Sequence, residues 1–458
     1  MAEHEYFLDH YLKYGLELSF HGEIYNHKEI NDFLSGYSSS NNLDYLYNAE
    51  LFLYLIHFLL NSNLDDFDDI VGYLKENQSY QFVFSGDGTI KSEFNFLIAT
   101  LYGSRMVNGD FVFSISDGEN MAISRDVVGS YLLYYGHDNK PSFANSRRTL
   151  LSNGILDVKT FKPGYVMFNG ELYPPLNPPW NKAANPENGL DLDLYIESKN
   201  LLIKLLKRSV NMRVNDLDEV GLFFSGGVDS TTIAKILRDV DGLDVRLFTV
   251  GTKNSKDLGV SKKIAKDLGL DLEFRVVNEE ILRSEFEDFL LIGESKNTVD
   301  LGVGMTMYLT SQLAVDGGFE TILTGQGADE LFGGYNRYLD VYAQDKNSLT
   351  DEFRGDIEFM YEVNLRRDLA IANFHDLNFR SPFLDKDFVR FALSLPVDYK
   401  VKSSDDKLRK HILRDVAVDL GVPSYIAYRQ KKAAQYGSGI HKIITKKVLP
   451  AYQGFSRL

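Results

Sequence analysis

Ser225-Gly226-Gly227-Val228-Asp229-Ser230 follows an apolar run at 220–224 and precedes a segment with helical periodicity. The paired glycines can take positive φ and leave no side chain between the backbone amides and a bound oxyanion, so the hexapeptide predicts an anion nest at a helix N-terminus. Ser225 and Ser230 add hydroxyl donors, and Asp229 places a carboxylate where a phosphate-bound magnesium would need one. A Walker A loop would end in Gly-Lys-Ser/Thr, and without that lysine γ-phosphate transfer is disfavoured. The alternative is an ordinary strand-to-helix turn capped by Asp229.

Apolar runs of strand length alternate with helical periodicity on either side of this loop. Buried strands are expected over 220–224, 245–250, 272–277 and 321–323, with helices over 230–238 and 261–268. This alternation predicts an α/β domain built on a doubly wound parallel sheet. Beyond about Gly334 the strand signal fades, and residues 356–373 and 407–420 are expected to be helical.

The residues before the loop have a different pattern. Short alternating segments separated by turn dipeptides such as Asn108-Gly109 predict a strand-rich domain. The polar stretch 174–186 contains five of the 11 prolines, which is typical of an interdomain linker. We therefore expect a first domain over 1–175, a linker over 176–195 and a second domain over 196–458.

The composition of the 458 residues excludes several classes of protein. Cysteine is absent, which excludes disulfides, thiolate zinc sites, iron–sulfur clusters and a cysteine nucleophile. The longest apolar stretch, 51–60, is too short to cross a membrane, and the first ten residues lack a signal-peptide core, so a soluble cytoplasmic protein with no membrane partner is expected. The net charge of −16 argues against nucleic-acid binding.

Basic residues gather near the end of the chain. From Lys400 onward there are 13 Lys and Arg against 4 Asp and Glu. Such a segment either meets phosphates or forms a solvated helix face, and charge alone leaves both readings open.

A second acidic segment follows the expected strand 321–323. Asp229 and Asp329 each come after a strand at the carboxyl edge of the sheet, where open α/β sheets bind ligands. Two carboxylates converging there could share Mg²⁺ on the phosphates of a nucleotide as pyrophosphate leaves. The alternative for Asp329-Glu330 is a carboxylate pair stabilised by a helix N-terminus.

Taken together, these motifs resemble those of ATP-dependent amidoligases, and of the asparagine synthetase family in particular. The matching stretches are Ser225–Ser230, Leu323-Thr-Gly-Gln-Gly-Ala-Asp-Glu-Leu-Phe-Gly-Gly-Tyr335, Arg380-Ser-Pro-Phe-Leu-Asp385, Lys407-Leu-Arg-Lys-His-Ile-Leu-Arg414 with Arg429-Gln430-Lys431, Gly22-Glu-Ile-Tyr-Asn-His27 and Ser124-Arg-Asp-Val-Val-Gly129. The resemblance implies an N-terminal Ntn-hydrolase-like αββα domain of the class II glutamine amidotransferase type. It implies that an ATP-pyrophosphatase domain with a helical C-terminal part follows.

The resemblance also implies roles for individual residues. Phe223 and Val250 would line the adenine pocket, and Thr324 and Gly325 would contact ATP. Lys431 matches the family lysine that stabilises the acyl-adenylate transition state, a role that suits a compact cation, whereas a solvated lysine is the alternative. ATP and Mg²⁺ are the expected cofactors.

The sequence departs from the glutamine-hydrolysing members of the family at several positions. Those members begin with a catalytic cysteine, which this chain lacks, and His21 stands where their asparagine would form an oxyanion hole. We therefore expect the first domain to lack glutaminase activity. Gln326 occupies the place of the glutamate that would take a proton from ammonia, and Asn378 replaces an acidic residue before Arg380; an amide can orient a nucleophile but cannot act as a base.

The expected function is an ATP-dependent amidoligase that activates a carboxylate as its adenylate and releases AMP and pyrophosphate. Its partners would be a small-molecule or peptide carboxylate and ammonia or an amine, and a homodimer is compatible with this reading. Two alternatives stay open: intramolecular amide formation, as in the similar β-lactam synthetases and lasso-peptide cyclases, and a non-catalytic ATP-binding pseudoenzyme. Modification of a nucleobase is disfavoured because the chain has neither cysteines nor a dedicated RNA-binding region.

Overall fold

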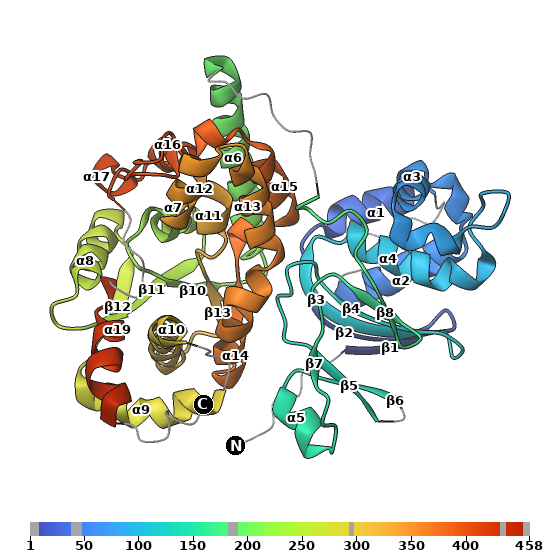
Figure 1. Ribbon diagram of the computed structural model, residues 1–458, viewed down its shortest axis with the longest axis horizontal. Coiled ribbons are helices and arrows are strands. Elements are labelled where there is room, and N and C mark those ends of the chain that lie inside the picture. Colours follow the sequence, from blue (N-terminus) through green and yellow to red (C-terminus); the bar gives the residue numbers. More distant parts are fainter. Residues whose placement is uncertain are drawn as a thin grey trace. The chain divides into compact units, whose positions relative to one another are not determined.

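The computed structural model describes residues 9–37, 48–138, 140–181, 191–292, 297–430 and 437–451. Lys431, the predicted transition-state lysine, lies outside the described residues. The chain divides into two compact units, Met1–Asn181 and Lys182–Leu458 (Figure 1), and the boundary falls within the proline-rich stretch of the sequence.

The first unit is built on a six-stranded antiparallel sheet with the order β1-β2-β3-β4-β8-β9. Its strands are β1 (Asp9–Lys13), β2 (Leu16–Ile24), β3 (Gly109–Ser116), β4 (Met121–Arg125), β8 (Val166–Phe168) and β9 (Glu171–Tyr173). A smaller sheet, of order β6-β5-β7, contains β5 (Tyr134–Asp138), β6 (Lys140–Ala144) and β7 (Lys159–Thr160). The helices are α1 (His27–Ser35), α2 (Asn48–Leu60), α3 (Asp68–Glu76), α4 (Asn95–Met106) and α5 (Arg147–Ser152), with 3₁₀ turns at Leu64–Asp66, Gln78–Val83 and Ser92–Phe94.

Alternating side chains give this sheet two buried faces. On one face Phe113 of β3 packs against Phe52 of α2, with ring centroids 4.5 Å apart, in a core that α2 and α4 cover. On the other face Val112 and Ile123 pack against Tyr135 of the smaller sheet. Because successive strand residues point to opposite faces, the period-two pattern of β3 produces this layering of helices, large sheet and small sheet.

The second unit contains a five-stranded, fully parallel sheet with the order β12-β11-β10-β13-β14. Its strands are β10 (Glu219–Phe223), β11 (Asp244–Gly251), β12 (Asp271–Val276), β13 (Thr321–Leu323) and β14 (Asn378–Arg380). The helices are α6 (Leu192–Met212), α7 (Val228–Arg238), α8 (Lys256–Leu268), α9 (Glu279–Ile292), α10 (Thr298–Asp316), α11 (Ala328–Phe332), α12 (Arg337–Gln344), α13 (Ser348–Glu358), α14 (Arg366–Phe374), α15 (Lys386–Ser394), α16 (His411–Asp419), α17 (Ser424–Ala427) and α19 (Ile440–Ile443). Shorter turns are π-helical at Tyr361–Leu365 and Ile444–Val448, and 3₁₀ at Pro382–Leu384, Val397–Tyr399 and Leu449–Ala451.

Helices cover both faces of this parallel sheet, as its apolar strands require (Figure 1). Helix α10 and α9 pack on one face around Val250 and Leu301, while α7 and α8 lie on the other. Local signals set the helix ends: the Ser255 hydroxyl caps α8 by accepting from the Leu258 amide at 3.2 Å, and Gly269, with φ +65, ends that helix. The structure is therefore the α/β fold that the sequence predicts.

The structure differs from the sequence expectations at three places in the second unit. The sequence does not predict strand β14, because its three residues are identifiable as a strand only through their pairing with β13. The helix expected over 356–373 is interrupted by the π-helical turn Tyr361–Leu365. The helix expected over 407–420 begins only at His411, because Arg409 and Lys410 have φ values of +50 and +55.

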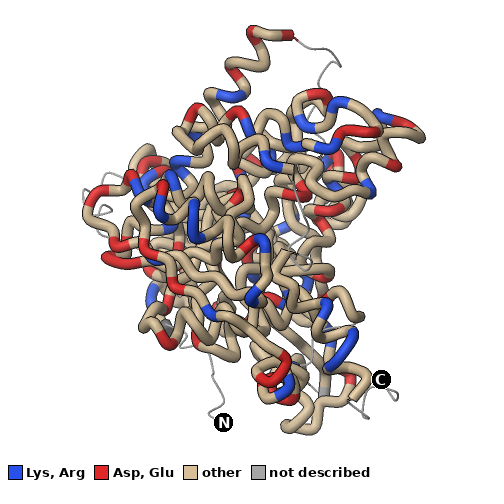
Figure 2. Tube along the Cα trace, turned by 90° about the vertical axis from the view of Figure 1, so that its left-hand side faces the viewer, with Lys and Arg blue, Asp and Glu red and all other residues tan. Residues whose placement is uncertain are grey.

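Basic and acidic positions are interspersed along the chain in the view of Figure 2. None of the helices within the described part of the chain has the length and apolar character that crossing a membrane requires.

Candidate active site

The loop after β10 has the shape of an anion-binding turn. Gly226 has φ +66, which favours glycine, whereas Gly227 has φ −78 and forms the N-cap of α7, so only the first glycine uses a positive φ. The amide of Gly227 donates to the Ser225 hydroxyl at 3.3 Å, and the Ser225 and Ser230 hydroxyls lie 3.4 Å apart. The first turn of α7 therefore presents its amide groups beside two hydroxyls, and Asp229 belongs to that turn.

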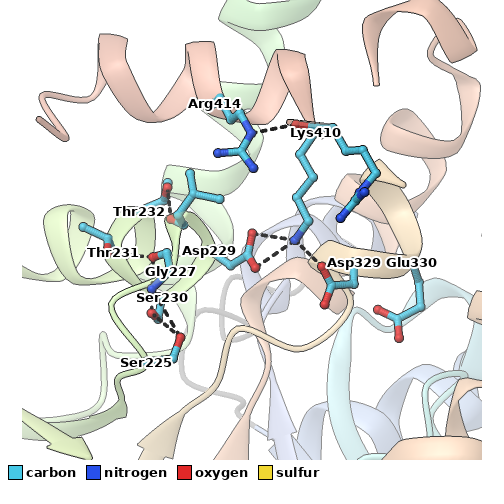
Figure 3. Close-up of polar contacts among 12 residues, drawn as sticks. Ser225, Gly227, Asp229, Ser230, Thr231, Thr232, Asp329, Glu330, Lys410 and Arg414 are labelled. Atoms are coloured by element: carbon cyan, nitrogen blue, oxygen red, sulfur yellow. Dashed lines mark hydrogen bonds and ion pairs between the residues drawn. The ribbon is translucent and has the colours of Figure 1, made fainter. Parts of the chain in front are cut away.

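A buried lysine joins the two predicted carboxylates (Figure 3). The Nζ atom of Lys410 lies 2.8 Å from both carboxylate oxygens of Asp229 and 2.5 Å from Oδ1 of Asp329. Burial alone would lower the pKa of the Lys410 ammonium, but the two carboxylates hold that pKa above its usual value. Asp229 and Asp329 thus converge, as expected from their places at the strand ends, with a cation between them.

The sequence did not identify Lys410 as a site residue. It lies in the basic segment that could have been a solvated helix face, yet only 1% of its surface is exposed. Its positive φ turns the chain just before α16. Gly334 makes room for the contact, because a Cβ there would lie 1.9 Å from Oδ1 of Asp329 and 2.6 Å from Cε of Lys410.

Two arginines fix the segments around Lys410 and the loop. Arg414 donates to the carbonyl oxygens of Leu408 and Arg409, each at 2.6 Å, and to that of Arg429 at 2.9 Å. Arg429 in turn donates to Asp257 at 3.1 Å and to the Gly226 carbonyl at 3.4 Å. These bonds tie the basic segments around Lys410 and Arg429 to the phosphate loop.

These groups line one cavity of about 460 Å³ at the carboxyl end of the parallel sheet. Its walls contain the following residues that the sequence singled out: Phe223, Ser225, Gly227, Asp229, Ser230, Val250, Thr324, Gly325, Gln326 and Asp329. Gly226 contributes its carbonyl to Arg429, and Asn378 lies in β14, paired with Thr321. The structure therefore brings together segments from β10, β11, β13 and the chain around Lys410.

The part of the cavity lined by α10 and α14 contains a buried polar cluster that the sequence did not identify. The amide of Gln326 donates from Nε2 to Oδ2 of Asp368. Arg367 donates from Nε to Oδ1 of Asp368 at 2.8 Å and from Nη1 to Oδ1 of Asp300 at 3.3 Å. In the sequence, Arg366-Arg367-Asp368 is a charge run within an expected helix, which more often marks a solvated face, so only the folded contact with Gln326 identifies it.

Asp229 and Asp329 have the donor chemistry that Mg²⁺ takes when it arrives with phosphates. Mg²⁺ is commonly held by one or two carboxylates together with waters and phosphate oxygens. Within the described ranges, no group of three or more His, Cys, Asp or Glu side chains could form a metal site from protein alone. The pair thus fits a nucleotide-borne Mg²⁺ and does not form a metal site by itself.

The first unit has its own polar cluster at the matched motifs. The Asn48 side chain accepts from the Ile24 amide and donates to Glu23, both at 2.8 Å. His21 of β2 stacks edge-on against Tyr131, with ring centroids 4.6 Å apart. The Gly22 position has φ +125, and a Cβ there would lie 2.1 Å from the Asp110 carbonyl, so the motif needs glycine.

Comparison with known proteins gives consistent matches. The family model described as asparagine synthase matches residues 201–356 and 343–449. The chain is 34% identical over 460 residues to a relative from Methanocaldococcus jannaschii whose name assigns it as a glutamine-hydrolysing asparagine synthetase, covering 88% of this chain and 81% of the relative. It is 26% identical over 439 residues to the asparagine synthetase of Sandersonia aurantiaca, covering 92% of this chain and 73% of that protein.

Solved structures also show similarity. Glutamine phosphoribosylpyrophosphate amidotransferase from B. subtilis matches with a TM-score of 0.24 and 13% identity, covering 70% of this chain and 63% of that chain. The NH3-dependent NAD synthetase of Campylobacter jejuni matches with a TM-score of 0.22 and 17% identity, covering 30% of this chain and 60% of that chain.

Proposed function

Because this chain belongs to the asparagine synthase family, we propose that it is an ATP-dependent ligase that joins a carboxylate to ammonia or to a substrate amine. The single observation that carries this proposal is the Asp229–Lys410–Asp329 cluster beside the glycine loop, in a cavity at the carboxyl end of the sheet. Ligands of open α/β sheets bind at this edge.

The first step is activation of the carboxylate. The amides at the start of α7, with the Ser225 and Ser230 hydroxyls, hold the phosphates of ATP. An oxygen of the substrate carboxylate attacks the α-phosphorus, the bond to the β-phosphate oxygen breaks, and pyrophosphate leaves with that electron pair. Phe223 and Val250, which line the cavity, contact the adenine. Thr324 and Gly325 also lie along the nucleotide.

Charge neutralisation is the main task of the chain's own residues in this step. The buried Lys410 ammonium balances part of the charge on Asp229 and Asp329, so that phosphates can approach two carboxylates. When bound, Mg²⁺ supplies Lewis-acid stabilisation of the departing pyrophosphate, and Asp229 and Asp329 are the residues that would hold it. Lys431 stabilises the negative charge that develops at the activated carboxyl group.

The nitrogen does not come from glutamine hydrolysed by this chain. Its 458 residues contain no cysteine, and a thiolate nucleophile is what hydrolysis of glutamine by this domain would need. We therefore assign the first domain as an amidotransferase fold without glutaminase activity.

The test is release of AMP and pyrophosphate from ATP and Mg²⁺. L-Aspartate with ammonium is the first substrate pair, and L-aspartate with glutamine is the control; other carboxylates follow. We expect turnover with ammonium or an amine and none with glutamine. Asp229→Ala should abolish AMP formation, while Asp239→Ala, at the exposed end of α7, should leave it unchanged. AMP formation that persists in Asp229→Ala would contradict the assignment, and ATP binding without turnover on any carboxylate would favour the non-catalytic alternative.

A further inference from the structure

The proposed amide-forming step needs a group that takes a proton from the amine, and Gln326 cannot be that group. A carboxamide nitrogen is not basic, and the amide of Gln326 already donates to Oδ2 of Asp368. The side chain of Asp368 lines the cavity with only 2% of the residue exposed. The contact therefore places a carboxylate directly behind the amide.

Most cavity carboxylates bind a lysine or an arginine, and Asp368 itself accepts from Arg367 at 2.8 Å. Asp229 and Asp329 are bound to Lys410, Asp257 to Arg429, and Asp300 to Arg367. Glu330 accepts from the Tyr335 hydroxyl at 2.7 Å and from the Asn364 amide at 3.2 Å. Asp300 also accepts from the Asn297 amide at 2.7 Å, so a neutral donor alone does not single out a carboxylate. What sets Asp368 apart is that its neutral donor is Gln326, the residue in the place of the expected base.

Position distinguishes Asp368 from Glu330. Gln326 follows Gly325, where a Cβ would lie 3.5 Å from both Cβ of Asp229 and N of Ser230. The partner of Gln326 is therefore held next to the segment that touches the phosphate loop. Glu330 lies in α11, which leads away from this contact toward Tyr335.

We propose that Asp368 accepts the proton of the attacking amine, with Gln326 positioning both the carboxylate and the amine; this rests on the function proposed above. The amine nitrogen, as the free base, attacks the carbonyl carbon of the acyl-adenylate and a C–N bond forms. The C–O bond to AMP breaks, and AMP leaves with that electron pair. One N–H proton passes to Oδ2 of Asp368.

The surroundings of Asp368 suit a base that works near neutral pH. Burial raises the pKa of the Asp368 carboxyl above its usual value, and the charge of Asp300 adds to this, while Arg367 and Gln326 oppose it. A general base is most effective when its pKa approaches the working pH. Arg367, fixed between Asp300 and Asp368, keeps the carboxylate in place as its charge changes.

The experiment separates activation from amine attack. The substrate is L-aspartate, or whichever carboxylate of a panel supports pyrophosphate release, with ammonium in one arm and hydroxylamine in the other. Pyrophosphate is measured as the readout of activation, and the amide or hydroxamate is measured as the readout of amine attack. Hydroxylamine is unprotonated at neutral pH and attacks acyl-adenylates without a base. Asp368→Asn should lower amide formation about 100-fold or more and hydroxamate formation by less than about tenfold. In the parent, protonation of Asp368 lowers the rate of amide formation at low pH. The residual rate of the Asp368→Asn variant should not show this decrease.

A swap of the two side chains guards against a purely structural effect. The double variant Gln326→Glu with Asp368→Asn again has one carboxylate and one amide at these two positions. Its rate of amide formation should be at least about tenfold higher than that of Asp368→Asn alone. Asp385→Asn is the matched control, because Asp385 is also buried against an arginine, Arg213, at 3.4 Å, away from the cavity lining. It should leave the ratio of amide to hydroxamate unchanged.

Four outcomes would overturn the proposal. Equal loss in both arms for Asp368→Asn would show a structural role, and no loss in either arm would show no role. Selective loss in Glu330→Gln, with Asp368→Asn unaffected, would assign the proton to Glu330. Absence of pyrophosphate release from the parent with every carboxylate would refute the proposed function itself, and this inference with it.

Discussion

Replacing Lys410 by methionine removes the cation between Asp229 and Asp329 and keeps a side chain of similar length. The two carboxylates, with side chains 21% and 22% exposed, are then left facing each other. Removing one partner of a buried ion pair costs about 3–5 kcal/mol. Because both carboxylates keep some contact with solvent, we expect the lower end, about 3 kcal/mol, which corresponds to a fall in Tm of about 6–12 °C for a unit of this size.

The pH dependence of this loss identifies its cause. Two carboxylates that share a site without a cation cannot both ionise easily, so the pKa of one of them rises in the variant. A carboxyl whose folded-state pKa is raised favours folding at low pH and loses that contribution as pH rises through the raised value. The loss of stability of Lys410→Met relative to the parent should therefore become smaller as the pH falls from 7 toward 4. At pH 7, Mg²⁺ should restore part of the lost stability.

The assay is thermal unfolding followed by circular dichroism, in the presence and absence of Mg²⁺. Lys407→Met, an exposed lysine of the same segment, is the control and should shift the free energy of unfolding by no more than about 0.5 kcal/mol. A Lys410→Met variant as stable as the parent, or one whose deficit is the same at pH 4 and pH 7, would refute the reasoning.

Two further predictions concern buried charges away from the cavity. Burial first, and the charge of Asp110 second, raise the pKa of Asp126 to about 6, so stability should fall as the pH rises from about 4 to 6. Asp110→Asn should lessen that fall. If the Tm of the variant and that of the parent depended on pH with the same slope, the prediction would be contradicted. Burial and then the charge of Arg354 lower the pKa of Lys400, whose Nζ lies 4.9 Å from the Phe353 ring centroid, to about 7. The parent should therefore gain stability between pH 7 and 10. At pH 6 the Lys400→Met variant should have a higher Tm than the parent, and its free energy of unfolding should be larger by up to about 5 kcal/mol. A lower Tm for Lys400→Met at pH 6 would show that the amine has a stabilising partner.

The strands that carry the phosphate loop and Asp329 could be predicted because their local signal is strong. The apolar runs at 220–224 and 321–323 are short, mostly buried and bounded by turn residues, and the structure has strands at Glu219–Phe223 and Thr321–Leu323. Their parallel order also brought Asp229 and Asp329 to one edge, because the carboxyl ends of parallel strands share it.

Lys410 and Asp368 could not be predicted in the same way, because distant contacts decide their environments. Lys410 is buried through a left-handed turn and through the space that Gly334 leaves, neither of which has a local sequence signal. Asp368 contacts Gln326, which lies 42 residues earlier in the sequence. Asp368 belongs to a helix whose register a preceding π-helical turn shifts. A charge run on an expected helix is typical of a solvated face, and only the folded arrangement shows otherwise.

The most direct test of adenylate chemistry at this site is the fate of ¹⁸O from a labelled carboxylate substrate. L-Aspartate labelled in its side-chain carboxyl is used first, followed by any carboxylate that supports turnover, and the nucleotide products are analysed by mass spectrometry. Activation as an acyl-adenylate transfers one ¹⁸O to AMP and releases unlabelled pyrophosphate. ADP with ¹⁸O in inorganic phosphate would instead show attack at the γ-phosphate, and it would contradict the proposed roles of the Ser225–Ser230 loop and the Asp229–Lys410–Asp329 cluster.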